Sequence, residues 1–268
     1  MSHPKQVFNE PTHRVKKGVV RAIKPFRDKI LFKYYLRKNT PVLVYQMGKV
    51  GSKSVFKSLC RQYSGVVLHA HKFHPNHANW RVRRLYHWVV EEGMPLNVIS
   101  LTREPISRNV SGFFQIFEKV AGVNYNSSNF TPEELKAIFL TKYFDKTPLQ
   151  WFDQNIKLNF GIDVYADSFP QYGYATYSNK NIRLLVMRSE ISDIEKIKAI
   201  KDFLKLAEFQ IVNRNIGEKK AYASIYKDFR THVKLPFDYI DELCNSKYFN
   251  HFYGEIYLDA VREKWGER

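Results

Sequence analysis

Four short apolar runs, each followed by a segment of helical periodicity, most constrain how this chain can fold. The runs are PVLVYQ (41–46), GVVLHA (65–70), LNVISL (96–101) and IRLLVM (182–187). Short continuous apolar runs are typical of buried strands, and strands that alternate with helices form parallel sheets. The length of 268 residues suits one such domain. We therefore predict an α/β fold, a P-loop-like three-layer domain with a central parallel sheet flanked by helices.

Charge divides the chain into two parts. The formal net charge is +17, and residues 1–40 hold eleven Lys and Arg against only Glu10 and Asp28. Apolar residues recur there at helical spacing, although Pro25 interrupts or kinks a helix. We predict a basic N-terminal tail and helix over 1–40 and one α/β domain over 41–268. The basic helix fits two interpretations, a solvated helix packed on the domain or a helix that contacts a membrane surface or an acidic partner.

Cysteine content and hydropathy bear on the compartment. Cys60 and Cys244 are the two cysteines and belong to no motif, which fits a reducing compartment. No apolar run reaches the roughly 18 to 20 residues that span a bilayer, and the first residues, MSHPKQ, lack the apolar stretch of a signal peptide. We expect a cytoplasmic protein, and leave open a peripheral contact with the inner face of a membrane through the basic segment. A chain trimmed from a longer, anchored protein would instead be lumenal in the Golgi.

The first strand runs into a loop rich in glycine, lysine and serine, MGKVGSKS (47–54). A strand, a Gly/Ser loop and a helix in succession present free backbone N–H groups and the positive end of a helix dipole, so the loop predicts an anion site. The NTPase pattern G-x-x-x-x-G-K-[ST], aligned on Lys53-Ser54, needs glycines where Met47 and Ser52 stand. The third strand also ends in Thr102-Arg103, whereas an NTPase usually places an aspartate for Mg²⁺ there. These residues indicate an anion that is held without a metal.

Two further patterns follow the second and third strands. His69 and His71 (HAH) end the second apolar run. In SLTREPISRNVSGFF, Arg103 ends the third strand, Pro105 begins the next helix, and Ser111 follows Arg103 by eight residues. Arg103 and Ser111 can converge on one phosphate beside the first turns of that helix. Imidazole is a natural general base for a hydroxyl group.

Taken in order, these motifs resemble those of sulfotransferases that use 3′-phosphoadenosine 5′-phosphosulfate (PAPS). Lys49, Ser52 and Ser54 match the phosphosulfate loop, and the His-x-His is similar to that of glycan sulfotransferases of the heparan and uronyl 2-O type. WFD (151–153), VMRSE (186–190) and HFY (251–253) also resemble bacterial capsular polysaccharide sulfotransferases. The resemblance covers about residues 41–255. Lys53 stands where the family often has threonine.

The resemblance implies an enzyme that moves a sulfuryl group from PAPS to a hydroxyl of a capsular or lipid-linked glycan, without a metal, and releases adenosine 3′,5′-bisphosphate. It implies that His71 is the base, with His69 in its place or as its partner, and that Lys49 stabilises the leaving phosphate. The implied nucleotide-binding residues are Lys49, Gly51, Ser52, Lys53, Ser54, Arg103, Ser111, Lys219 and Lys220. An anionic acceptor would suit the positive charge, and no nucleic acid is expected as a partner.

Other interpretations of the same residues stay open. A nucleotide-dependent kinase with a degenerate P-loop would need a metal, and a basic nucleic-acid or polyanion-binding module would show steep salt dependence. Lys49, Lys219 and Lys220 can be solvated lysines, and Arg103 can belong to a structural ion pair. The histidines of the run His69, His71, His74 and His77 can instead form a metal site or lie on the surface. Glu104 or Glu190 can act as the base or orient the histidine.

Overall fold

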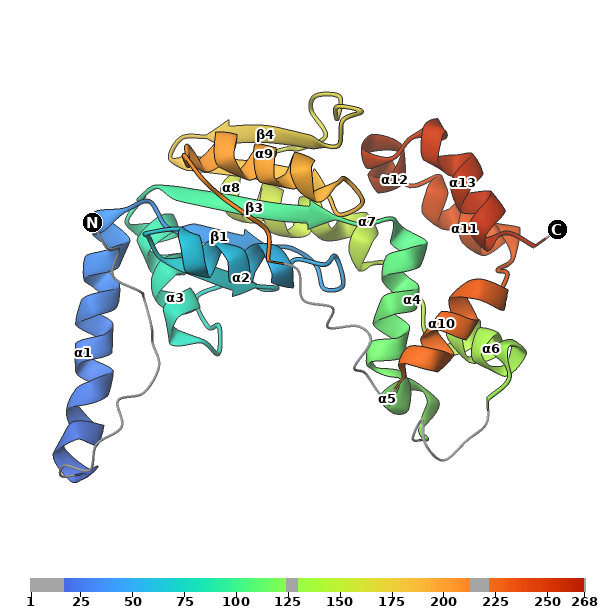
Figure 1. Cartoon of the computed structure of the whole chain (residues 1–268), viewed down its shortest axis with the longest axis horizontal. Helices are drawn as coiled ribbons and strands as arrows, with labels where there is room; N and C mark the ends of the chain where they lie inside the picture. Colours follow the sequence, from blue (N-terminus) through green and yellow to red (C-terminus); the bar gives the residue numbers. More distant parts are fainter. Residues whose placement is uncertain (1–16, 124–129, 213–221, 268) are drawn as a thin grey trace.

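The predicted alternation of strands and helices is confirmed in the computed structural model, which describes residues 17–123, 130–212 and 222–267 (Figure 1). In chain order the elements are α1 (Lys17–Lys38), β1 (Val42–Tyr45), α2 (Lys53–Gln62), β2 (Val67–Ala70), α3 (Trp80–Tyr86), the π-helical η1 (His87–Glu91), β3 (Leu96–Thr102), α4 (Pro105–Gln115), α5 (Phe117–Ala121), α6 (Pro132–Lys142), α7 (Thr147–Trp151), the π-helical η3 (Phe152–Lys157), α8 (Leu158–Phe160), β4 (Tyr174–Asn179), β5 (Ile182–Arg188), α9 (Asp193–Leu204), α10 (Ala223–His232), α11 (Phe237–Cys244), α12 (Lys247–Phe252) and α13 (Glu255–Trp265).

The five strands form one sheet in the order β2-β1-β3-β5-β4. The four predicted strands are the four parallel ones, and all of them place their carboxyl ends at the same edge. The predicted α/β domain with a central parallel sheet is confirmed, and a fifth strand that the sequence did not indicate, β4, pairs antiparallel with β5 through a tight hairpin. β4 (YATYSN) is polar and only half-buried, so it lacks the apolar run that marks the other strands.

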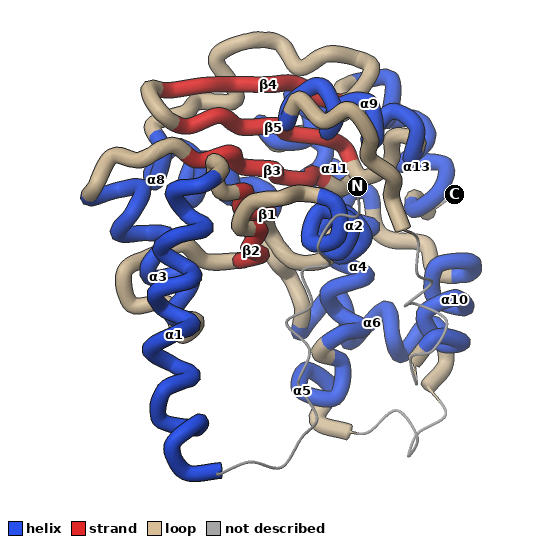
Figure 2. The backbone as a smooth tube through the Cα atoms, turned by 60° about the vertical axis from the view of Figure 1, so that its left-hand side comes forward, coloured by secondary structure: helices blue, strands red, loops and turns tan. Residues whose placement is uncertain are grey.

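Helices cover both faces of the sheet (Figures 1 and 2). α2 and α9 lie on one face, and α7, η3 and α8 lie on the other. Tyr45 of β1 points to the second face, where its ring lies 5.1 Å from that of Trp151. Because alternate residues of a strand point to opposite faces, Val44 and Gln46 lie on the side of α2. The helices α4–α6 and α10–α13 gather beyond the carboxyl ends of the strands (Figure 1).

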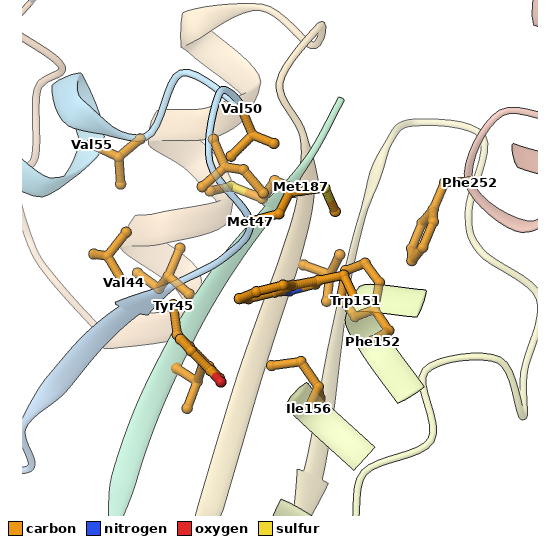
Figure 3. Packing of buried hydrophobic residues seen from close by; sticks show 14 of the residues in the cluster. Val44, Tyr45, Met47, Val50, Val55, Trp151, Phe152, Ile156, Met187 and Phe252 are labelled. Atoms are coloured by element: carbon orange, nitrogen blue, oxygen red, sulfur yellow. The ribbon is translucent and has the colours of Figure 1, made fainter. Parts of the chain in front are cut away.

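Two apolar residues anchor the first loop to the core. Met47 and Val50 are each 1% exposed, and they belong to the same buried cluster as Trp151 and Met187 (Figure 3). A Cβ atom built on Gly48 or Gly51 would meet nothing within 4 Å. The loop therefore alternates between residues that enter the core and glycines that face open space, which holds its backbone in place while one side stays accessible.

Local signals at helix starts match the structure. Pro105 is the first residue of α4, and Thr131 with Glu134, a pair at capping-box spacing in the sequence, forms the capping box of α6. The helix that Pro105 begins ends at Gln115, and α5 follows from Phe117. The first helix runs through Pro25 as one element from Lys17 to Lys38.

Candidate functional site

The loop between β1 and α2 has the backbone conformation of an anion site. Lys49 and Gly51 have φ values of 74° and 78°, and Ser52, the N-cap residue of α2, follows in the right-handed helical region. A positive φ followed by a right-handed residue turns successive N–H groups toward one side. The Ser52 side chain makes no capping hydrogen bond to α2. The first N–H groups of α2 and its positive dipole end are thus available to an anion.

Two arginines after β3 hold the carbonyl groups of this loop. Arg103 Nη1 donates to the carbonyl of Lys49 at 2.8 Å, and Arg108 Nε donates to that of Gly48 at 3.1 Å. Arg108 is also paired with Asp145. Within the described residues Arg103 belongs to no ion pair with a carboxylate, contrary to the structural interpretation that the sequence left open. The structure therefore brings Arg103 and Lys49, predicted from separate motifs, into contact.

The two histidines lie beside the loop on the face of α2. His69 is paired with Val44 across β1 and β2, and His71 follows two residues later, just beyond the strand. His71 Nδ1 lies 2.8 Å from the carbonyl oxygen of Gln46, the residue between β1 and the loop. A carbonyl oxygen only accepts, so Nδ1 carries the proton and Nε2 keeps a lone pair. His71 is exposed, so this lone pair can accept a proton from a bound molecule.

His69 has a different environment. Its Nε2 lies 2.9 Å from Gln46 Nε2 and 3.0 Å from Ser52 Oγ. Since an amide nitrogen only donates, His69 Nε2 accepts. Burial, followed by the positive charges of His71 and Lys53, lowers the pKa of His69 to about 4. His69 is therefore neutral near pH 7 with its lone pair already occupied, and this geometry favours His71 over His69 as a base.

Gln46 connects these parts, and the sequence analysis missed it. It is fully buried, its side-chain nitrogen donates to Ser52 Oγ at 2.6 Å, and its carbonyl accepts from His71. Its Oε1 has no hydrogen-bond partner among the described residues. An amide placed at the end of a buried strand, directly before a glycine loop, is the sequence signal that could have identified it, because buried amides need partners.

Both glutamates proposed as alternative bases have structural partners instead. Glu104 caps α4 by accepting from the N–H groups of Ile106 and Ser107. Glu190 accepts from the N–H of Glu104 at 2.9 Å and from the hydroxyl of Tyr253 at 3.2 Å. Both carboxylates therefore accept hydrogen bonds that stabilise the turn between β3 and α4, and this turn positions Arg103.

The remaining predicted residues are distributed around this centre. Ser54 lies in the first turn of α2, and Lys53 is exposed beside it. Ser111 is half-buried in the second turn of α4, one turn beyond Ser107, whose hydroxyl accepts from Lys264 at 3.1 Å. Lys219 and Lys220 lie outside the described residues.

In the part of the chain that the structure describes, no three His, Cys, Asp or Glu side chains are grouped as metal ligands, and no helix is long and apolar enough to cross a membrane.

Comparison with known proteins yields one match. A family model described as "Putative capsular polysaccharide synthesis protein" matches residues 123–254, so part of this chain fits a polysaccharide-related family. The matched segment runs from just after α5 to just before α13 and lies entirely after the Met47–Ser54 loop, His69, His71 and Arg103. No curated protein and no solved structure matches the chain.

Proposed function

We propose that this protein is a sulfotransferase that moves a sulfuryl group from PAPS to a hydroxyl of a glycan. The observation that carries the proposal is the junction at Gln46. Its carbonyl orients His71, while its side chain binds Ser52 at the start of the helix that follows the loop. A base and an anion-binding loop are thus held by one buried residue, as a transfer from an anionic donor to a hydroxyl requires.

The loop is the proposed site of the 5′-phosphosulfate. During transfer, negative charge builds on the oxygen that bridges phosphorus and sulfur, and a lysine with backbone N–H donors stabilises it. Lys49 has a φ of 74°, a conformation that costs a non-glycine residue about 1–2 kcal/mol. A lysine therefore occupies a backbone conformation that favours glycine, and such strained residues are concentrated at functional sites.

His71 is the proposed base. As the acceptor oxygen forms its bond to sulfur, the bond between sulfur and the bridging phosphate oxygen breaks. The hydroxyl proton goes to His71 Nε2, and adenosine 3′,5′-bisphosphate leaves with the electron pair. The bond from Nδ1 to Gln46 sets the tautomer that this step requires and stabilises the imidazolium that forms.

Arg103 and Ser111 are the proposed partners of the 3′-phosphate. A guanidinium has five N–H donors, and the bond to the Lys49 carbonyl uses one of them. The remaining donors suit a phosphate, and Ser111 on the adjoining helix can add a hydroxyl. A glycan as the acceptor is supported by the polysaccharide-related family that matches residues 123–254.

Calorimetric titration in EDTA tests the donor site without knowledge of the acceptor. Adenosine 3′,5′-bisphosphate, AMP and ATP are titrated into the wild type, Arg103→Ala and, as a control, Arg61→Ala at the far end of α2. We expect the bisphosphate to bind, AMP to bind far more weakly, and Arg103→Ala to weaken bisphosphate binding about 10- to 100-fold, as for hydrogen bonds to a charged group. Arg61→Ala should leave it unchanged.

Two outcomes would overturn the proposal. One is no binding of the bisphosphate. The other is found when the titration is repeated with Mg²⁺ in place of EDTA: ATP that then binds as tightly as the bisphosphate, and does not bind in EDTA, would favour the kinase.

A further inference from the structure

The first helix presents one face that no described part of the protein covers. Phe32 and Leu36, four residues apart, are buried, and the Phe32 ring lies 5.2 Å from that of Trp80. At about 100° per residue, Tyr34 is about 160° from both of these around the helix, and Ile30 is about 160° from Phe32 and about 120° from Leu36, so they lie on the opposite side. α1 extends beyond the sheet in both views (Figures 1 and 2).

This outward face combines large apolar side chains with cations. Ile30 is 53% exposed, Leu31 36% and Tyr34 57%. The exposed cations of the same segment are Arg27, Lys29, Lys33, Arg37 and Lys38. Apolar residues gathered on one exposed helical face are costly in water, and cations among them are typical of helices that lie in the headgroup layer of a membrane.

The surroundings of this face lack acidic residues. Asp28 is the one acidic residue of α1, and between it and Glu91 the chain has no Asp or Glu and twelve Lys and Arg, so the part of α1 after Asp28, α2 and α3 carry only cations. Such a potential attracts anionic surfaces. A polyanion in solution would satisfy the cations but would leave Ile30, Leu31 and Tyr34 in water, whereas an anionic bilayer accommodates both.

We propose that the outward face of α1, formed by Arg27, Ile30, Leu31, Lys33, Tyr34 and Lys38, binds the surface of an anionic phospholipid bilayer. The apolar side chains enter the boundary between headgroups and acyl chains, and the cations contact the lipid phosphates. α1 ends just before β1 begins, at the amino edge of the sheet, and the Met47–Ser54 loop lies at the carboxyl edge. Binding through this face therefore leaves the candidate site accessible.

Vesicle flotation with the full chain tests this proposal. The vesicles are phosphatidylcholine alone, or phosphatidylcholine with roughly a third of phosphatidylglycerol. One variant, Ile30→Ser/Tyr34→Ser, removes apolar groups, and the other, Lys33→Gln/Lys38→Gln, removes charge. The matched controls replace exposed residues elsewhere, Ile194→Ser/Ile256→Ser and Lys119→Gln/Lys142→Gln.

We expect binding to the anionic vesicles only. The charge variant should weaken it about 25-fold, at about fivefold for each cation, and the apolar variant at least about tenfold. The controls should bind like the wild type, and salt should weaken binding. Affinity for adenosine 3′,5′-bisphosphate should be the same in all variants, so failure here is distinguishable from failure of the proposed function.

Three results would overturn the proposal. The first is no binding to anionic vesicles. The second is binding that depends on the cations but not on Ile30 and Tyr34 and is matched by a soluble polyanion such as heparin, which would identify a polyanion site. The third is self-association, seen by sedimentation equilibrium and lost in Ile30→Ser/Tyr34→Ser, without vesicle binding. That result would assign the face to a second copy of the chain.

Discussion

Replacing Asp145 by asparagine should destabilise the protein strongly, because it leaves a buried cation without its partner. The Arg108 side chain is 7% exposed and that of Asp145 is 24% exposed. Burial alone would raise the pKa of Asp145, but the Arg108 charge and the hydrogen bonds from Thr147 outweigh it and lower that pKa. Arg108 also donates to the Gly48 carbonyl, so the pair supports the loop.

The expected magnitude follows from this burial. Removing one partner of a fully buried ion pair costs about 3–5 kcal/mol. Because about a quarter of the Asp145 side chain stays exposed, we expect a loss of about 2–4 kcal/mol in the free energy of unfolding. For a chain of this size, each kcal/mol lowers Tm by about 2–4 °C.

Urea unfolding at pH 7 measures the loss, with Asp163→Asn as the control. Asp163 pairs with Lys157 at 2.7 Å, but the two side chains are 34% and 52% exposed, so its removal should cost under about 1 kcal/mol. Affinity for adenosine 3′,5′-bisphosphate should also fall in Asp145→Asn and not in Asp163→Asn. Equal losses of stability in the two variants, or a loss below about 0.5 kcal/mol in Asp145→Asn, would refute this account of the pair.

Three further predictions concern the site. His71→Ala should slow release of the bisphosphate from PAPS in the presence of a glycan acceptor about 10²- to 10⁴-fold, and should change bisphosphate affinity less than about twofold. The control His74→Ala should leave both the rate and the affinity unchanged. The folded-state pKa of His69, about 4, lies below the ordinary histidine pKa of 6.5, so the unfolded chain binds more protons between these values. Stability should therefore fall by about 1–2 kcal/mol as the pH drops from 6.5 to 4, with a smaller pH dependence of urea unfolding in His69→Ala. Gln46→Leu removes the donor to the buried Ser52 Oγ, while the Ser52 hydroxyl can still donate to His69 Nε2. It should cost about 1–3 kcal/mol in thermal unfolding, against under about 1 kcal/mol for Gln62→Leu on the surface.

The strands and helix starts that could be predicted from the sequence depend on interactions between residues close together in the chain. The apolar runs predicted all four parallel strands, because a strand buried on both faces needs apolar residues throughout. Pro105 and the Thr131/Glu134 pair marked two helix starts, because capping involves residues within one turn. The parallel topology then placed the loop and His71 at one edge of the sheet, since parallel strands share their carboxyl end.

Only the tertiary structure decided how the site is held together. Arg108 and Asp145 are 37 positions apart, and Gln46 meets His69 across 23 positions. The residues adjacent to each partner in the sequence do not indicate that these pairs will form. Whether a glutamate caps a helix, as Glu104 does, or a histidine nitrogen faces a backbone carbonyl, as Nδ1 of His71 does, depends on which groups the fold places within hydrogen-bonding distance. Burial and hydrogen bonding between distant segments determine the protonation of each group, and the residue types alone do not.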